Sequence, residues 1–273
     1  MIIPRIHEGL AMYQDLSFGE RLREWRQRRR MSQLDLAAEA DLSTRHLSFV
    51  ETGRSKPSRE VVLRLAEVLD LPLRGRNTML LSAGYAPTYP ERPFDDSALG
   101  SARDVVQRVL DAHMPFPALA VDRHWQLLTN NAAVAALLVG LPAELLQPPV
   151  NVLRLSLHPE GLAPRIANLA EWKRHIIDRL RHQIVESADP VLEQLLEELR
   201  GYPAPASKIP ASGEAVIAVP MQLDSPAGRL SFISTTTVFG TPVEVTLSEL
   251  AIETFFPADA ETAERLRLLS QTL

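Results

Sequence analysis

Apolar side chains recur every three to four residues through the first third of the chain, which is the spacing of one face of an α-helix. Ser32 and Ser43 lie where two of the helical patterns begin, and Gly53 and Gly84 lie where two of them end, as is usual at helix caps. The pattern predicts five short helices, over residues 18–30, 32–40, 44–53, 59–70 and 74–83.

The composition changes at residues 87–98. Three prolines fall between Pro87 and Pro93. Because proline fixes φ and lacks an amide donor, this stretch is predicted to be an extended linker rather than a helix.

Beyond the linker, helical patterns mix with strand patterns. Helices are predicted over residues 101–113, from Asn130 onward, and over 150–157, 164–187, 189–199 and 260–269. Strands are predicted on either side of a turn at residues 122–124 and over residues 215–223, 229–238 and 243–254. We therefore expect an N-terminal arm (1–16), an all-α domain of five helices (17–86), the linker (87–98) and an α+β domain with an antiparallel sheet of about five strands (99–273).

The composition is that of an ordinary globular protein, with 273 residues of which 45% are apolar and 23% charged. A chain without cysteine has neither disulfides nor thiolate metal sites. No apolar run approaches the roughly 18 residues that a membrane span requires, and the N-terminus lacks the pattern of a signal peptide. We expect a cytoplasmic protein with no membrane partner.

The net charge of −5 conceals an asymmetry. Residues 17–64 carry 11 Lys and Arg against 7 Asp and Glu, whereas residues 91–273 carry 15 against 23. A basic segment joined to an acidic one points to a polyanionic partner for the first segment alone.

The second and third predicted helices have an apolar inner side and a polar outer side. Thr, Arg and His at the front of an outward helix face suit the major groove of DNA, where such side chains reach base edges. The candidates for base contact are Thr44, Arg45, His46 and Phe49. Helix N-termini and nearby cations favour phosphate oxygens, and the candidates for phosphate contact are Ser32, Gln33, Ser43, Arg54 and Lys56. Phe49 either meets a thymine methyl group or packs inward, His46 contacts either DNA or nothing, and Glu51 is expected to hold Arg54 or a helix end.

The stretch "MSQLDLAAEADLSTRHLSFVETGRSKPS" resembles the xenobiotic-response-element family of helix-turn-helix domains, which includes Cro and lambda repressor. In that family the position of Gln33 touches the DNA backbone, and the positions of Thr44, Arg45 and Phe49 face the bases. The resemblance implies sequence-specific binding to a double-stranded DNA operator. Because one such module buries a small interface, we expect a homodimer on two half-sites.

The second domain carries two resemblances. Trp125, Gln126, Leu127, Leu128 and Asn131 are spaced as at the opening of a PAS domain. The stretches "NVLRLSLHPEGLAPRIANL" and "LSFISTTTVFGTPVEVTLSELAIETFFPAD" resemble MmyB-like transcription regulators. That family implies a PAS-like domain that encloses an apolar small-molecule effector, with fatty acid the suspected class, and no required cofactor.

Four residues of the second domain are candidates for ligand contact. Arg165, Asn168 and Trp172 are spaced by three and four residues, so a continuous helix would place them on one face. His158 lies nearby, and Arg165 suits a carboxylate. In the alternative interpretation His158 caps the preceding helix, Arg165 pairs within its own domain, and the domain only dimerises the DNA-binding heads.

Catalytic motifs are missing from the sequence. It contains no Gly-x-Ser-x-Gly elbow, Gly-rich phosphate loop or His-Glu-x-x-His pair. We expect neither an enzyme nor a metal site.

Overall fold

The computed structural model describes residues 16–205 and 219–271. By Cα proximity the chain divides into two compact units. The first contains the described residues up to Glu91 together with Ile184–Pro190 and Val243–Ser248, and the second contains the remainder. Of the predicted N-terminal arm, residues 1–15 lie outside the described residues.

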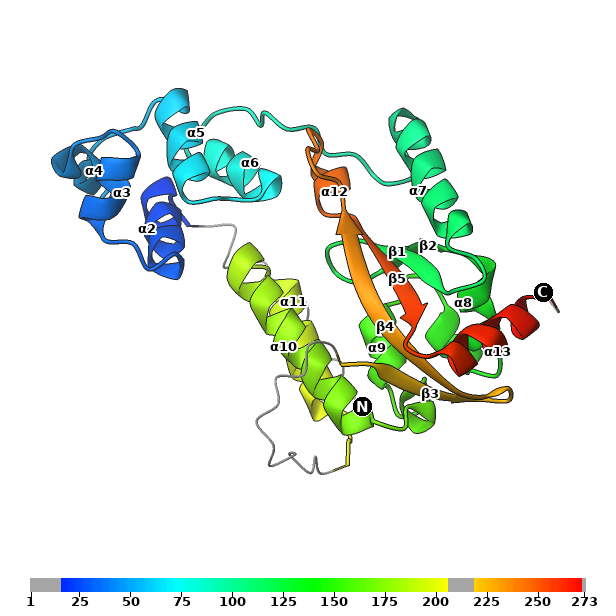
Figure 1. Ribbon diagram of the computed structural model, residues 1–273. Coiled ribbons are helices and arrows are strands. Elements are labelled where there is room, and N and C mark those ends of the chain that lie inside the picture. The colour runs from blue at the N-terminus through cyan, green and yellow to red at the C-terminus, as the bar shows by residue number, and fades with distance from the viewer. Residues whose placement is uncertain (1–15, 206–218, 272–273) are drawn as a thin grey trace. The chain divides into compact units, whose positions relative to one another are not determined.

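Five helices form the N-terminal part of the first unit, as predicted (Figure 1). They are α2 (Phe18–Arg28), α3 (Gln33–Glu39), α4 (Thr44–Glu51), α5 (Arg59–Val68) and α6 (Leu73–Ser82). A serine side chain caps each of the first four helices by accepting a backbone N–H three residues on; these serines are Ser17, Ser32, Ser43 and Ser58. The helices share one core, in which Leu22, Leu36, Leu47, Leu65 and Met79 are fully buried.

Helix α2 packs very closely on α4, because Gly19 carries no side chain. A Cβ atom at this position would overlap the backbone carbonyl of Glu51. Between the helices the backbone reverses at residues with positive φ, including Asp41 (52°) before α4 and Gly53 (72°) after it. These turns fix which side of α4 faces outward.

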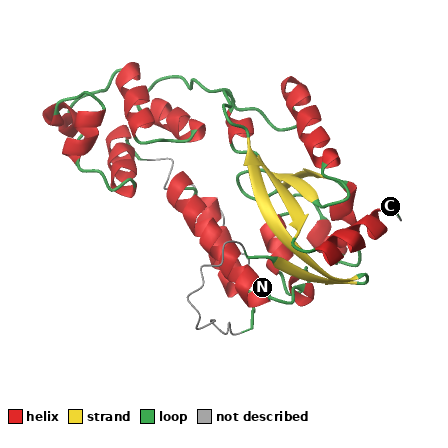
Figure 2. Cartoon of the chain, viewed as in Figure 1, coloured by secondary structure: helices red, strands yellow, loops and turns green. Residues whose placement is uncertain are grey.

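The remaining elements contain five strands, which form one antiparallel sheet in the order β2-β1-β5-β4-β3. Figure 2 shows the strands in yellow. The strands are β1 (Ala118–Val121), β2 (Leu127–Asn130), β3 (Met221–Ser225), β4 (Gly228–Val238) and β5 (Ala251–Pro257). The α-helices are α7 (Gly100–Ala112), α8 (Ala132–Leu137), α9 (Val152–Leu157), α10 (Leu169–Ser187), α11 (Pro190–Gly201), α12 (Val245–Ser248) and α13 (Ala260–Ser270). Three short 3-10 helices are η1 (Ser97–Leu99), η2 (Ala143–Leu146) and η3 (Ala163–Arg165). The expected α+β domain with an antiparallel sheet of about five strands is confirmed.

The two faces of the sheet have different neighbours. Side chains alternate along a strand, so Ala118 and Ala120 of β1 and Ile252 of β5 point to the face where Val106 and Leu110 of α7 form a core with them. The intervening residues of the same strands point to the opposite face. That opposite face contributes one wall of the cavity described below.

The stretch predicted as one strand over residues 243–254 divides into helix α12 and strand β5. Glu244 is the cause, because its carboxylate accepts the backbone N–H of Leu247 at 2.8 Å and its carbonyl accepts that of Ser248 at 3.1 Å. These bonds stabilise a helical turn where the β-branched residues alone favour a strand.

The helix predicted over residues 164–187 begins only at Leu169. Ile166 instead pairs with Leu223 of β3 in an isolated bridge, and the backbone N–H of Ala167 donates to the carbonyl of Gln222 at 2.8 Å. The predicted strand over residues 215–223 begins at Met221, and its residues 215–218 lie outside the described residues.

Across residues 16–205 and 219–271, every helix is too short or too polar to cross a bilayer. The same residues contain no group of three or more His, Cys, Asp or Glu side chains placed to hold a metal ion.

Candidate functional site

Helix α4 divides its side chains as the sequence predicts. Leu47 and Val50 are buried in the helical core. Thr44 and Arg45 are exposed, and His46 and Phe49 are partly exposed. The four candidates for base contact therefore lie on the accessible side of one short helix, although contact with DNA stays a prediction.

The ring of Phe49 lies between two guanidinium groups. The guanidinium carbon of Arg45 is 5.3 Å from the ring centroid and that of Arg54 is 6.0 Å from it. Cation–π attraction of this kind restricts the rotamers of both arginines. Phe49 thus orients the side chain of Arg45 before any partner is bound.

The candidates for phosphate contact have different local roles. The hydroxyls of Ser32 and Ser43 each accept a backbone N–H at 3.1 Å, from Asp35 and His46 respectively. Arg54 and Lys56 are exposed after α4, and the Lys56 ammonium lies 5.3 Å from the ring centroid of Tyr85. All four side chains keep N–H or O–H groups that could donate a hydrogen bond to a phosphate oxygen.

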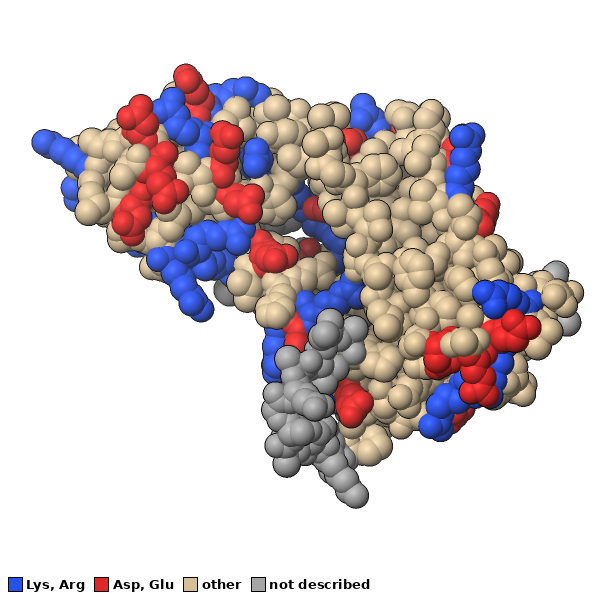
Figure 3. Space-filling model, in the orientation of Figure 1, with Lys and Arg blue, Asp and Glu red and all other residues tan. Residues whose placement is uncertain are grey.

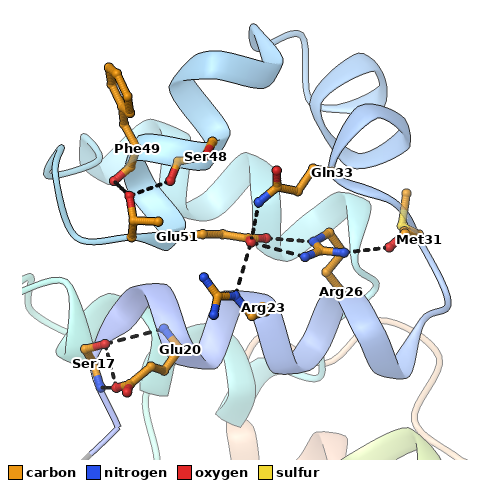
Figure 4. Close-up of polar contacts among 10 residues, drawn as sticks. Ser17, Glu20, Arg23, Arg26, Met31, Gln33, Ser48, Phe49 and Glu51 are labelled. Atoms are coloured by element: carbon orange, nitrogen blue, oxygen red, sulfur yellow. Dashed lines mark hydrogen bonds and ion pairs between the residues drawn. The ribbon is translucent and has the colours of Figure 1, made fainter.

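Gln33 is held by Glu51 in an interaction that joins three helices (Figure 4). Gln33 Nε2 of α3 donates to Glu51 Oε2 of α4 at 2.7 Å. Arg26 of α2 donates to both carboxylate oxygens of Glu51, at 2.7 and 3.1 Å, and the Nε atom of Arg23 is 3.5 Å from Oε2. The expectation that Glu51 holds Arg54 or a helix end is wrong.

The Glu51 side chain is completely buried. Burial alone would raise the pKa of its carboxyl, but the hydrogen bonds from Arg26 and Gln33 and the charges of Arg26 and Arg23 outweigh it and lower the pKa. Glu51 is therefore ionised at neutral pH and fixes α4 against α2 and α3.

The first unit presents charged side chains of both signs. In the view of Figure 3, Lys and Arg are interspersed with Asp and Glu over helices α2–α6.

Arg29 donates to the carbonyls of Leu69 and Asp70, both at 2.8 Å. Arg29 therefore fastens α2 to the end of α5.

A cavity of about 100 Å³ lies in the second unit, against the sheet face opposite α7. Most of its lining is aliphatic or aromatic. Its walls include Leu119, Leu223, Phe232 and Phe255 from the sheet, Val134 and Leu137 from α8, Leu153 and Leu155 from α9, and Trp172 and Ile176 from α10. Such a mainly apolar lining suits the hydrocarbon part of a small molecule.

Polar groups enter this cavity from α9, α10 and β5. Arg179 of α10 donates to both oxygens of Glu253 of β5, including a contact of 3.1 Å from Nη1 to Oε2. The Arg179 guanidinium carbon lies 4.4 Å from the centroid of the Trp125 ring, whose Nε1 donates to Gln183 at 2.8 Å. Glu253 is buried, with 3% of its surface exposed.

His175 lies one helical turn before Arg179. Its ring stacks on Trp172 with centroids 5.3 Å apart and an interplanar angle of 28°. Burial lowers the pKa of His175, and the charge of Arg179 adds to this effect against the opposing charges of Glu253 and Asp178. The imidazole is therefore neutral at pH 7.

Of the four predicted ligand-contacting residues, Trp172 lines the cavity, and its Nε1 donates to Ser156 Oγ at 2.9 Å. The structure places His158, Arg165 and Asn168 outside the cavity lining. Arg165 belongs to η3 and donates to the carbonyls of Leu137 and Asp224, so the expected helix face shared by Arg165, Asn168 and Trp172 does not exist.

Asn168 and His158 have bonds of their own. The Asn168 amide donates to the carbonyl of Pro220 at 2.8 Å and accepts the N–H of Gln222 at 3.0 Å, which fixes the start of β3. His158 ends α9, and its Nδ1 accepts the N–H of Glu160 at 3.1 Å. Nothing in this geometry favours either residue as a ligand contact.

Two family models match the chain. The MmyB-like transcription regulator ligand binding domain matches residues 102–269, and a helix-turn-helix domain matches residues 17–79. The chain belongs to the MmyB-like transcription regulators. It is accordingly a DNA-binding transcription regulator with a ligand-binding domain, as the resemblances predict.

A curated relative of this MmyB-like regulator is a protein of Methanoculleus marisnigri named "Putative HTH-type transcriptional regulatory protein". The two are 33% identical over 111 residues, which cover 39% of this chain and 35% of the relative. The chain thus aligns with about a third of the relative's length. A solved RNA-binding light-oxygen-voltage receptor aligns with 99% of this chain and 69% of its own, at 13% identity, but its TM-score of 0.29 is too low to carry an argument.

The polar end of the cavity in this MmyB-like regulator was not predicted from the sequence. Trp172, His175 and Arg179 are spaced by three and four residues within α10, so helical spacing does group them once the helix is known to begin at Leu169. Glu253 stands out as a carboxylate inside the apolar run "AIETFF". Both signals are visible in the sequence, but whether Glu253 lies close to the α10 residues depends on how distant segments pair.

Proposed function

We propose that this MmyB-like regulator binds its operator as a homodimer and that an apolar small molecule in the cavity changes its affinity for DNA. The cavity, bounded by the sheet, α8, α9 and α10, is the observation that carries this proposal. A domain that served only for dimerisation would have no need of such a space, because well-packed cores leave few voids larger than a water molecule.

The effector class follows from the lining and from the family. A mainly apolar wall with one polar end matches a molecule that has a hydrocarbon chain and a single polar head. A fatty acid, the class that the family resemblance implies, is the first compound to test. No cofactor is required, and the function proposed is not catalytic.

On the DNA side, Thr44, Arg45, His46 and Phe49 would contact base edges. The residues Ser32, Gln33, Ser43, Arg54 and Lys56 would contact the phosphate backbone. The accessible side of α4 and the restricted rotamer of Arg45 support this assignment. Because the Gln33 side-chain amide is engaged by Glu51, its free groups for a phosphate are the amide's second hydrogen and its backbone N–H.

Coupling between effector and operator requires two arrangements of the dimer that the effector binds unequally. The change in DNA affinity can be no larger than the difference between the effector's affinities for the two arrangements. Palindromic operators demand a fixed spacing of the two α4 helices, so a change in that spacing is sufficient.

Mass spectrometry of the purified full chain tests the effector. Native and denaturing spectra are compared, and a bound mass that is lost on denaturation is expected. In a Val134→Phe variant, which fills the cavity from α8, this mass should be absent. A Val105→Phe variant serves as the matched control, because Val105 is 48% exposed on α7.

A mass that survives in Val134→Phe at the wild-type level would place the occupant elsewhere. If no mass is bound, and neither added fatty acids nor their alcohols and amides change operator affinity in either protein, the domain acts only as a dimerisation module. Sedimentation of the same samples measures whether the chain is a dimer.

A further inference from the structure

The polar end of the cavity is electrically neutral. Among the lining residues, which all belong to the described chain, the formal charges are those of Arg179 and Glu253. Thr236 Oγ1 completes their contact by donating to Glu253 and accepting from Arg179, each at 2.6 Å. The cation and the anion therefore cancel inside the domain, without a ligand.

The positive charge of Arg179 is already balanced within the domain. Its two Nη atoms are bonded to Glu253 and Thr236, and one face of the guanidinium is covered by Trp125. A ligand carboxylate that displaced Glu253 from Arg179 would leave the Glu253 carboxylate without a partner. The side chain of Glu253 is only 5% exposed, so this unpaired charge would be buried. Removing one partner of a buried ion pair is strongly unfavourable.

Among the described lining residues, His175 is the polar side chain that makes no hydrogen bond within the protein. Across the described residues, neither nitrogen of its ring has a protein hydrogen-bond partner, although the ring lines the cavity and is fixed by stacking on Trp172. A neutral imidazole offers one donor and one acceptor. This pair of groups suits a hydroxyl, an ester, a ketone or an amide.

We propose that the cavity binds an uncharged amphiphile, a hydrocarbon chain ending in an alcohol, ester, ketone or amide, whose head group hydrogen-bonds to His175. The inference rests on the proposed function and specifies its ligand. The ligand has the hydrocarbon tail of a fatty acid, but its head group carries no charge. A carboxylate or an ammonium head would bring an unbalanced charge into a mainly apolar space, which is costly.

The test uses the full chain, stripped of bound lipid, at pH 8. Calorimetric titrations compare decanamide with decanoate, whose heads have nearly the same shape, and add decan-1-ol and decylammonium. Decanamide and decan-1-ol are expected to bind at least tenfold more tightly than either ion. This comparison needs no variant and so does not depend on any substitution folding.

Two substitutions test whether Glu253 and His175 cause the preference for an uncharged head group. Glu253→Gln keeps the shape of the side chain and frees the charge of Arg179, so decanoate is expected to gain at least tenfold and to overtake decanamide. His175→Phe keeps the stacking and removes the hydrogen bond, so decanamide should weaken about fivefold while decanoate is unchanged. His182→Phe, at an exposed position of α10, is the matched control and should change neither.

The outcomes separate this inference from the proposed function. If wild-type protein binds decanoate or decylammonium as tightly as decanamide, the uncharged head is excluded while an effector-binding cavity stands. If the folded chain binds none of the four probes, the effector function is contradicted and the inference falls with it.

Discussion

Gln33 on α3 donates its side-chain amide to Glu51 on α4 at 2.7 Å, so the helix before the turn holds the helix after it through a buried carboxylate. The same carboxylate accepts two hydrogen bonds from Arg26 on α2. The Glu51 side chain, at the far end of α4, therefore helps to hold the orientation of the face that carries the candidates for base contact.

Replacing Glu51 with Ala should destabilise the helical unit by about 3–5 kcal/mol, because Arg26 would be left without its buried partner. Gln33→Ala should cost about 1 kcal/mol, the usual value of one hydrogen bond. Urea unfolding followed by circular dichroism measures both. Glu60→Ala is the control. Glu60 pairs with Arg64 at the surface, and its side chain is 83% exposed, so its removal should change the unfolding free energy little.

Acid should remove the stabilisation that Glu51 provides. The pKa of this carboxyl is lower in the folded protein than its ordinary value of 4.5, so its contribution is fully present above that value and is lost as the pH falls through the lower, folded pKa. The difference in unfolding free energy between wild type and Glu51→Gln should be constant from pH 7 to about 5 and shrink below about 4.5. A difference that does not change with pH would contradict the ionised state.

Gly19→Ala should be destabilising and Gly75→Ala stabilising, although both glycines lie in helices. A Cβ at residue 19 overlaps the backbone of α4, whereas a Cβ at residue 75 makes ordinary contacts of 3.5 Å with Leu71 and Pro72. We expect a loss of about 1–3 kcal/mol at the first site and a gain of about 0.5–1 kcal/mol at the second. Thermal unfolding of the two variants in parallel checks the opposite signs.

Arg45→Ala should weaken binding to the operator by about 1–3 kcal/mol and relax the preference at one base position. Fluorescence anisotropy with the operator and with random duplexes provides the measurement. Equal losses on both kinds of DNA would exclude a role in base recognition. Phe49→Leu, which removes the ring that orients Arg45, should reproduce part of the loss.

Lys56→Ala should weaken binding to operator and random DNA alike, since a phosphate contact carries no sequence information. The slope of log K against log salt concentration should fall by about one unit for each phosphate that the ammonium neutralises. An unchanged slope would show that Lys56 does not neutralise a phosphate. Arg30→Ala tests by the same measurement whether the exposed residue after α2 contributes.

The helical half of the fold was predictable because its signals are local. Ser32 and Ser43 cap the helices that their positions predict, and the apolar spacing of Leu47 and Val50 identifies the buried side of α4. The partner of Glu51 was not predictable, because Arg26 lies 25 residues away and reaches it only through the packing of α2 on α4.

The sheet and its cavity depend more on distant pairing. Arg179 and Glu253 are 74 residues apart and meet because β5 lies between β1 and β4 with α10 across one face. A pattern of alternating apolar residues gives neither that order nor its register. The error at Val243–Thr254 has a different origin, since the single carboxylate of Glu244 outweighs the strand preference of its neighbours.

Two tryptophans of the ligand-binding domain have stacked or cationic neighbours, and their fluorescence should report on the contents of the cavity. The chain has three tryptophans; Trp125 and Trp172 line the cavity beside Arg179 and His175, whereas Trp25 lies in the helical unit near Arg29. Indole emission responds to the charges and solvent around the ring, so whatever enters the cavity alters two of the three emitters. In a Trp25→Phe protein, all tryptophan emission would come from the two indoles that line the cavity.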